Sequence, residues 1–260
     1  MNKLVFLTVC FLSILQAAPG NPPLFEGKQL LKRATLLHEK TQLLQAHAIF
    51  ERIMVADNEN YLARYYLAKC EYELSVHELG AQDFNMLFRY VNSAIAHLDH
   101  VLEQKSNWSE AQLLLSNLYG FKIHALQLKG DYAQTQTLGM KSIEYANLAL
   151  ENGTNNPRAY LTMGIIKFNM PQEYGGSAEI AQQYIQKAID LFAASAPSDS
   201  LAPDWGYPES FSWMGQILEK LNKPQEALKS YEQALSIEPD FVWVKYDLLP
   251  KLNTRLASEK

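Results

Sequence analysis

Cysteine is scarce in this sequence, and a surplus of basic residues is missing. Only two of the 260 residues are cysteine, too few for a disulfide-stapled scaffold or a four-cysteine zinc site. The 23 Lys and Arg residues are outnumbered by 28 Asp and Glu, which gives a formal net charge of −5. Because duplex-binding domains carry a basic surplus, we expect no nucleic acid among the partners.

Apolar runs of membrane-spanning length are missing too. Residues 4–15 form a run of twelve apolar or small residues. As a helix it would span about 18 Å, against about 30 Å for a hydrocarbon core, so we expect no integral membrane span. Lys3 precedes the run, and small residues with Pro19 and Gly20 follow it. This order is typical of a secretory signal peptide and predicts a leader at 1–18, cleaved after Ala17 or Ala18.

The leader prediction makes the chain periplasmic or secreted, with one mature domain at 19–260. The alternative is a lipoprotein anchored through Cys10, but Val9 is bulkier than the residue usual before such a cysteine. Cleavage leaves Cys70 as the single thiol, within the apolar helical pattern YYLAKCEYEL. We therefore predict a buried core cysteine, the alternative being a bridge between two chains.

Patterns that carry chemistry are sparse. His97 and His100 stand three apart and could offer two metal ligands, but no third ligand at a convincing spacing accompanies them. HExxH, Gly-x-Ser-x-Gly and P-loop patterns are absent. We expect no metal, no cofactor and no enzymatic activity. A hydrolase built on paired carboxylates stays an alternative that no pattern favours.

Residues 208–241 carry the strongest pattern in the chain. Small residues at Gly215 and Ala227 would let two antiparallel helices approach closely, and Tyr231 and Ala234 share one helix face. Pro239 would end the second helix because it lacks an N–H group. With Phe211, Met214 and Leu218 these residues follow the 34-residue spacing of the tetratricopeptide repeat (TPR), so this segment resembles the TPR family.

Weaker copies of the same pattern precede it at 157–193, 109–154, 61–106 and 27–58. Four of the five predicted second helices share the spacing Ala-x3-apolar-x2-apolar, as in Ala46, Phe50 and Ile53. Sustained alternation of apolar and polar residues, which would indicate strands, is not found. The expected fold is all-α: a TPR-like α-solenoid of about five helix pairs with a capping helix at 242–257.

The resemblance implies a concave groove lined by the first helix of each pair. Carried onto this sequence, the groove positions are Tyr65, Lys69, Tyr72, Leu113, Asn117, Leu161, Ile165, Phe168 and Gln216, with Glu219 beside Gln216. An apolar and aromatic groove of this kind suits an extended or helical peptide. In the alternative interpretation, Leu161, Ile165 and Phe168 pack against the last helix and are never exposed.

Two insertions depart from the plain repeat, at 169–176 and 195–207. Gly175 and Gly176 would permit a tight turn, and Tyr174 and Trp205 are large rings placed in loops. These four residues either fill gaps in the solenoid or form a lip for a ligand or partner.

The same segments carry a narrower resemblance, to exported bacterial TPR proteins and to the TRAP transporter T-component. The main hypothesis is an exported scaffold that binds a protein or peptide partner in the cell envelope through its groove. The alternative is a T-component-like accessory, a homo-oligomer that handles a small ligand with a solute-binding protein.

Overall fold

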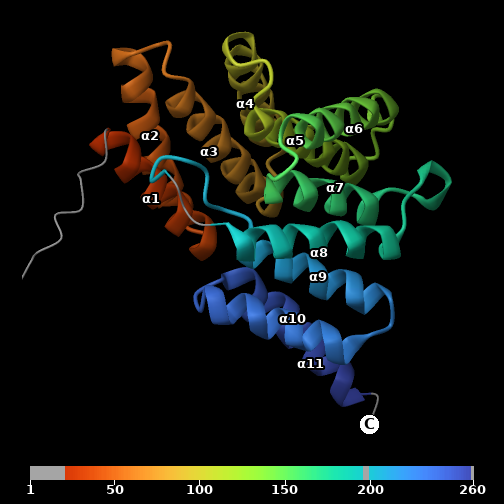
Figure 1. Ribbon diagram of the computed structural model, residues 1–260. Helices are drawn as coiled ribbons and strands as arrows, with labels where there is room; N and C mark the ends of the chain where they lie inside the picture. Colours follow the sequence, from red (N-terminus) through yellow and green to blue (C-terminus); the bar gives the residue numbers. More distant parts are fainter. Residues whose placement is uncertain (1–20, 196–198, 259–260) are drawn as a thin grey trace, which may run out of the picture.

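The computed structural model describes residues 21–195 and 199–258; the predicted leader at 1–18 and Cys10 lie outside them. All regular elements within these ranges are helical (Figure 1). The helices are α1 (Pro22–Leu37), α2 (Lys40–Ala56), α3 (Tyr61–Gly80), α4 (Phe84–Gln104), α5 (Ser109–Leu128), α6 (Thr135–Asn152), α7 (Pro157–Asn169), α8 (Ala178–Ala194), α9 (Tyr207–Lys220), α10 (Pro224–Ile237) and α11 (Leu249–Ser258), with a short 3-10 turn η1 (Gln172–Tyr174) and a π-helical turn η2 (Val244–Leu248).

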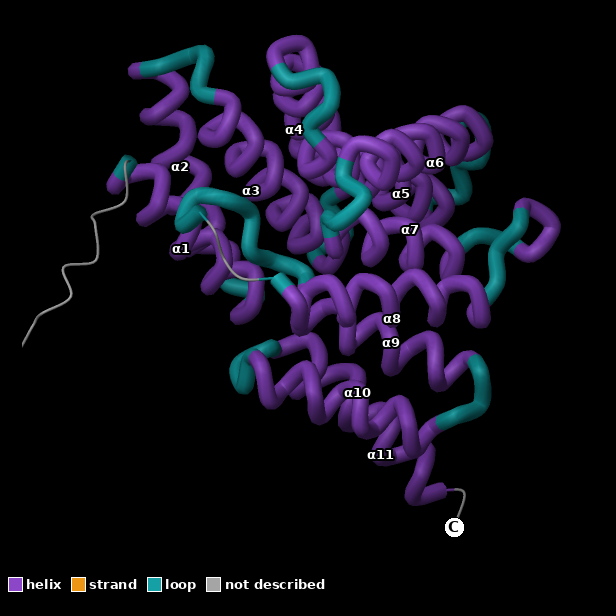
Figure 2. Tube along the Cα trace, viewed as in Figure 1, coloured by secondary structure: helices purple, strands orange, loops and turns teal. Residues whose placement is uncertain are grey.

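Consecutive helices form antiparallel pairs that stack in chain order, as Figure 2 shows. Side chains at the helix starts satisfy free backbone N–H groups: Asn60 accepts from Ala63, Asp83 from Met86 and Ser177 from Ile180. The all-α solenoid of five helix pairs expected from the sequence is confirmed.

The recurring alanine motif lies at the contact between the two helices of a pair. Ala46, Ala94, Ala181 and Ala227 are fully buried, and so is the apolar residue four positions after each of them. A small residue at this point lets the partner helix approach, and the larger residue one turn later fills the space beside it. Cys70 is likewise fully buried and free, as predicted, and burial raises the pKa of its thiol.

The predicted capping helix is divided into two parts. A π-helical turn, in which the Leu249 N–H donates to the Val244 carbonyl, precedes α11. Pro250 explains the wider turn, because it has no N–H to donate and its ring would clash with the carbonyl four residues earlier. Val244 and Leu252 are both buried and seal the last core cluster.

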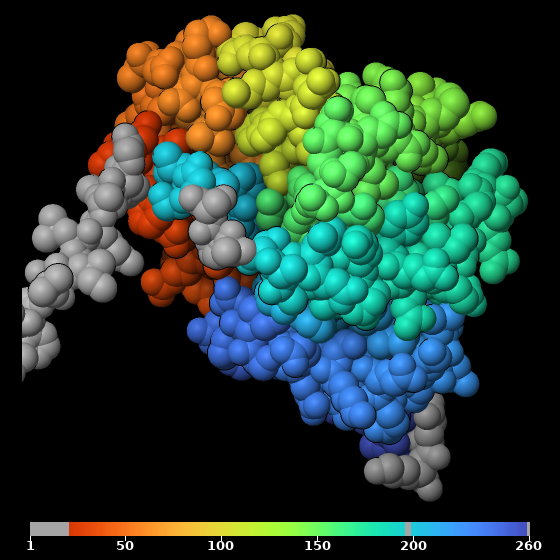
Figure 3. Space-filling model, viewed as in Figure 1, coloured from red at the N-terminus to blue at the C-terminus, as the bar shows by residue number. Residues whose placement is uncertain are grey.

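The stack of helices is curved, so that α1 contacts residues in the last third of the chain. Lys32 on α1 lies 3.9 Å from the Asp204 carboxylate and 3.5 Å from that of Glu238, which follows α10. Two hydrophobic clusters, one centred on α1–α6 and one on α7–α11, form the core, and Trp205 packs against both. Residues 199–206, between α8 and α9, contact α1 on this side, as the space-filling view shows (Figure 3).

The close approach of α9 and α10 gives a stability prediction. A Cβ atom at Gly215 would overlap the Tyr231 ring, which is fully buried and donates a hydrogen bond of 2.5 Å to Glu219. Gly215→Ala is therefore expected to lower the free energy of unfolding by about 1–3 kcal/mol, the usual cost of overpacking.

Gly80 provides the matched control, because a Cβ atom at this helical glycine would meet no atom within 4 Å. Gly80→Ala is expected to leave stability unchanged or to raise it by less than about 1 kcal/mol. Urea unfolding measures both variants, and equal effects would contradict the proposed helix contact.

Candidate functional site

The α8–α9 connection occupies the inner side of the solenoid. Residues 199–206, here called the inner segment, run in an irregular, non-helical path across α1, α3 and α7. The buried Tyr66 hydroxyl donates to the Leu201 carbonyl at 2.6 Å, and the Lys28 ammonium donates to the Ser200 carbonyl at 2.8 Å. Side chains from the first helices of two pairs thus hold the backbone of this segment.

Trp205 is the anchor of the inner segment. Its indole N–H donates to the Tyr65 hydroxyl at 3.1 Å. The ring centroid lies 4.8 Å from the Lys69 ammonium and 5.9 Å from the Arg158 guanidinium carbon. Two cations near one indole ring, combined with a hydrogen bond at its edge, specify a tryptophan at this position better than another apolar residue.

The Arg158 guanidinium is held in place by the Glu110 carboxylate. Its guanidinium makes three hydrogen bonds of 2.7–2.9 Å to the Glu110 carboxylate and one of 3.4 Å to the Trp205 carbonyl. Burial disfavours the charged guanidinium, but the Glu110 charge outweighs this effect and raises the pKa of Arg158. A paired, well-bonded guanidinium is a fixed donor rather than a mobile surface charge.

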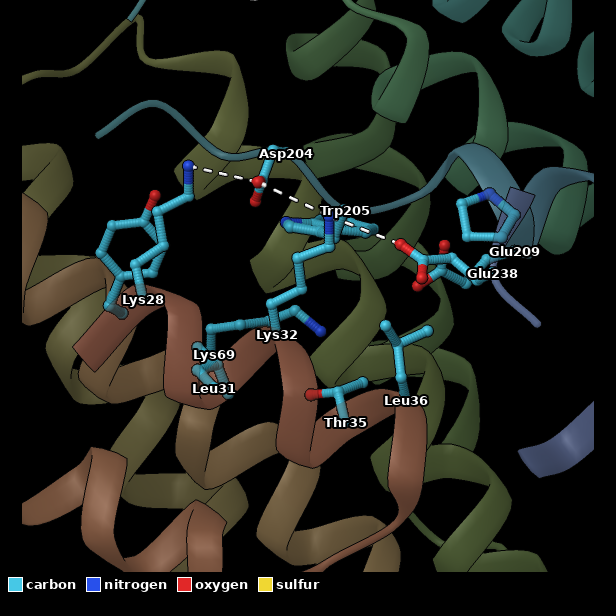
Figure 4. Close-up of a pocket in the computed structure, with 12 residues that line it drawn as sticks. Lys28, Leu31, Lys32, Thr35, Leu36, Lys69, Asp204, Trp205, Glu209 and Glu238 are labelled. Atoms are coloured by element: carbon cyan, nitrogen blue, oxygen red, sulfur yellow. Dashed lines mark ion pairs between the residues drawn. The ribbon is translucent and has the colours of Figure 1, made fainter. Parts of the chain in front are cut away.

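Lys28 and Asp204 form a pair at the rim of the site. The Lys28 ammonium lies 3.4 Å from the Asp204 carboxylate and is nearly inaccessible to solvent (Figure 4). Burial lowers the pKa of Lys28, although the Asp204 charge opposes this shift. Burial also raises the pKa of the Tyr65 and Tyr66 hydroxyls, so both stay protonated at neutral pH.

The cavity left at this site is small. It measures about 50 Å³ and is lined by α1, α3, the inner segment, the start of α9 and Glu238 after α10. Ligand pockets commonly measure about 300–1,000 Å³, whereas a single water needs about 10–15 Å³ of such space. The cavity therefore has room for a few waters. Lys28, Lys32, Lys69 and Glu238 are among the residues that line it (Figure 4).

Several predicted groove residues do not face a groove. Tyr65, Leu113 and Leu161 are 0–2% exposed, and Lys69 is 7% exposed. They pack under the inner segment or between neighbouring helices, and the Lys69 ammonium pairs with Glu73. The expectation that these four residues form an open partner-facing wall is wrong, because the chain covers that surface itself.

The remaining predicted positions are half-buried. Tyr72 meets Phe121 with ring centroids 5.7 Å apart, and Phe168 meets Trp213 at 6.1 Å. Asn117, Ile165, Gln216 and Glu219 are also half-buried, on the first helices of the third, fourth and fifth pairs. The two aromatic pairs, Tyr72–Phe121 and Phe168–Trp213, therefore keep part of their surface accessible.

The predicted loop lip is divided. Tyr174, Gly175 and Gly176 precede α8 and Trp205 follows it, with a helix of 17 residues, about 25 Å long, between them in the chain. Figure 1 shows the turn before α8 and the segment after it at opposite ends of that helix. Tyr174 is 71% exposed, and Gly175 has φ of +90°, which favours glycine. Gly176 lies so close to the Met170 carbonyl that a Cβ atom would not fit. These residues build a turn, and the idea of one lip shared with Trp205 is wrong.

Sequence reasoning missed the residues that hold the inner segment, namely Lys28, Tyr66, Glu110, Arg158 and Asp204. Their signal is weak in the sequence because Lys28 and Asp204 are 176 positions apart, and the solenoid's curvature alone brings them together. The large Trp205 ring in a loop rich in proline and glycine was the available indication.

In the part of the chain that the structure describes, the requirements of a metal site and of a membrane-spanning helix are not met. No group of three His, Cys, Asp or Glu side chains there is placed to hold a metal ion. His97 lies 3.9 Å from the buried Glu71 carboxylate and His100 3.2 Å from that of Glu103. Among these same residues, no helix has the length and hydropathy needed to cross a bilayer.

The anchoring role of Trp205 gives a second prediction. Trp205→Ala is expected to lower the free energy of unfolding by at least about 2 kcal/mol, approaching the about 3–5 kcal/mol typical of a buried aromatic ring. Trp205→Phe should cost less, because it keeps the apolar ring. Tyr174→Ala, at an exposed ring, is the control and should change stability by less than about 0.5 kcal/mol. Equal losses of stability in the Tyr174→Ala and Trp205→Ala variants, measured by thermal unfolding, would contradict the anchoring role of Trp205.

Glu209 gives a prediction for pH. This half-buried carboxylate accepts the Gly206 N–H at 2.9 Å, and burial raises its pKa above the ordinary 4.5. The protonated form is therefore favoured in the folded state, so the stability that Glu209 contributes falls as the pH rises above 4.5.

Glu209→Gln keeps the acceptor and carries no charge. The variant should gain stability relative to wild type between about pH 4 and about pH 7. A difference in the free energy of unfolding that does not change with pH would contradict the raised pKa of Glu209. Glu209→Ala, which loses the acceptor, should cost about 1 kcal/mol at acidic pH. Urea unfolding at several pH values measures all three proteins.

Comparison with known proteins supports the fold. The tetratricopeptide repeat family model matches residues 208–241. The structure is similar to the HusA haemophore from Porphyromonas gingivalis, with 22% identity, a TM-score of 0.64 and coverage of 76% of this chain and 92% of that one. It is also similar to TTC0263, a thermophilic TPR protein of Thermus thermophilus, with 18% identity, a TM-score of 0.59 and coverage of 89% and 97%.

No curated protein is detectably similar to the chain. The narrower resemblance to the TRAP transporter T-component gains no support from these comparisons. The match at 208–241 and the shared architecture agree with the helix pairs described above. Residues 208–241 match the tetratricopeptide repeat family, and the described residues as a whole have the TPR-like α-solenoid fold.

Proposed function

We propose that this protein is an exported, non-enzymatic scaffold that binds an extended segment of a partner protein on the inner side of its solenoid, in the cell envelope. One observation carries the proposal: this face already holds an irregular, non-helical piece of polypeptide, the inner segment, by its backbone carbonyls. The leader-like residues 1–18 support export.

The contacts on the inner segment are those that a bound peptide needs. Lys28, Tyr66 and Arg158 each donate to a backbone carbonyl, at 2.8, 2.6 and 3.4 Å. Contacts to carbonyls supply affinity with little dependence on sequence, whereas the Trp205 site adds selectivity for one side chain. The face therefore suits polypeptide better than a small polar metabolite.

The two aromatic pairs extend the surface that a partner could reach. The Lys220 ammonium lies 4.7 Å from the Phe168 ring, so this end combines a cation with apolar area. Aromatic residues that keep some exposure are common anchors in protein interfaces. We therefore include Phe168 and Gln216 in the proposed partner surface.

A haemophore shares the fold, but its cargo is not transferred to this chain. The likeness of 22% identity concerns the architecture. The cavity of about 50 Å³ is far below the about 300–1,000 Å³ of usual ligand sites. A partner segment lying along the surface needs no such cavity.

Photo-crosslinking in cells tests the proposal. A photoreactive amino acid at position 168 or 216 is expected to trap one discrete protein in the envelope fraction, because these positions lie on the proposed surface. The same group at position 55, where Val55 is 89% exposed on α2, is the control and should trap none.

A chain without residues 1–18 serves as the second control and should lose the envelope product. Equal labelling from positions 55 and 168, or trapping that does not require the leader, would contradict an exported scaffold that uses its inner face.

A further inference from the structure

We propose that the inner face is a receptor for a partner segment in which an acidic residue directly precedes a tryptophan, and that residues 199–206 occupy this receptor until the partner displaces them. The inference rests on the proposed function and adds the chemistry of the partner. It starts from the way in which the chain's own Asp204 and Trp205 are held.

The receptor consists of groups from helices that are remote in sequence from the inner segment. Lys28 and Lys32 of α1 lie 3.4 and 3.9 Å from the Asp204 carboxylate. Tyr66 of α3 donates to the Leu201 carbonyl at 2.6 Å. Together these groups bind one carboxylate and one backbone carbonyl at a fixed separation along the segment. A separate polypeptide can present the same two groups.

The site for the neighbouring residue binds an indole ring. Tyr65 accepts the Trp205 N–H at 3.1 Å, and the Lys69 ammonium lies 4.8 Å from the ring. The Arg158 guanidinium, fixed by Glu110, contacts the carbonyl of the same residue at 3.4 Å. A phenylalanine would lose the hydrogen bond, and a leucine would lose the cation–π contacts as well.

The receptor is more strongly built than a loop needs for attachment. Four basic side chains converge on two consecutive residues, and Lys28 and Lys69 are both more than nine-tenths buried. Asp204 itself remains exposed, so one edge of the occupied site is open to solvent. A competing segment can approach the carboxylate position first and the tryptophan position afterwards.

Tethering sets the strength of the competition. A segment joined to its receptor by a short connection acts at an effective concentration on the order of 1 mM. A free peptide that binds the vacant receptor with a Kd of about 100 µM would then bind the closed chain about tenfold more weakly. Weakening the chain's own segment should remove this penalty.

The test uses a labelled peptide with the sequence of residues 199–206, DSLAPDWG, blocked at both ends. The full chain carrying Asp204→Asn with Trp205→Ala is expected to bind it about tenfold more tightly than the wild-type chain, as measured by fluorescence anisotropy. A control peptide with Asn and Ala in place of the Asp-Trp pair should bind neither chain.

Matched receptor variants in the same double-variant chain sharpen the result. Lys28→Met and Tyr66→Phe should each weaken peptide binding at least about fivefold, with helical circular dichroism unchanged. Equal binding of both peptides, or no response to the receptor variants, would overturn the proposal. A wild-type chain that elutes as a dimer and dissociates on adding the peptide would assign the site to a second copy and would also overturn it.

A second measurement needs no destabilising change. The wild-type chain labelled with 5-fluorotryptophan should show a shifted Trp205 resonance when excess peptide is added, while the Trp243 resonance stays in place. Trp205→Phe assigns the signal. A Trp205 resonance unmoved at millimolar peptide would overturn displacement. Crosslinking from position 168 that persists in that case would leave the scaffold function intact, so the two failures are distinguishable.

Discussion

The Trp205 ring, on a loop between α8 and α9, packs against both hydrophobic clusters of the molecule. Its indole N–H bonds to the fully buried Tyr65, and its carbonyl meets Arg158. A TPR solenoid normally holds its curvature through contacts between successive pairs alone. Here a residue between the fourth and fifth pairs touches the second and fourth pairs together, and this contact links the two hydrophobic clusters.

Two charge pairs position this ring, one buried on both sides and one with an exposed carboxylate. Glu110 holds the Arg158 guanidinium, and Asp204 lies beside the buried Lys28 ammonium. Desolvating such pairs costs much of what their attraction returns, so they are weak evidence for stability. Their directional hydrogen bonds instead fix one arrangement of the inner segment. The same directionality would let the face distinguish an Asp-Trp segment from other peptides, which connects the architecture with the proposed binding role.

Much of the fold could be predicted from particular residues. The spacing of Gly215, Ala227 and Tyr231 identified the last repeat, and the alanines of four of the five second helices marked where those pairs close. The candidate site was harder to predict. Repeat positions placed Tyr65, Leu113 and Leu161 on a groove, but burial depends on what covers a surface, and the family spacing contains no information about an inserted loop.

The sequence by itself determined the local structure: helices, their ends and the pairing faces, because these follow from periodicity, capping residues and small side chains within about 34 residues of one another. The tertiary structure decided whether the inner side is open. Lys28 and Asp204 meet across 176 positions because small rotations between successive pairs add up until α1 faces the α8–α9 connection. That sum is a property of the whole stack, and no single repeat encodes it.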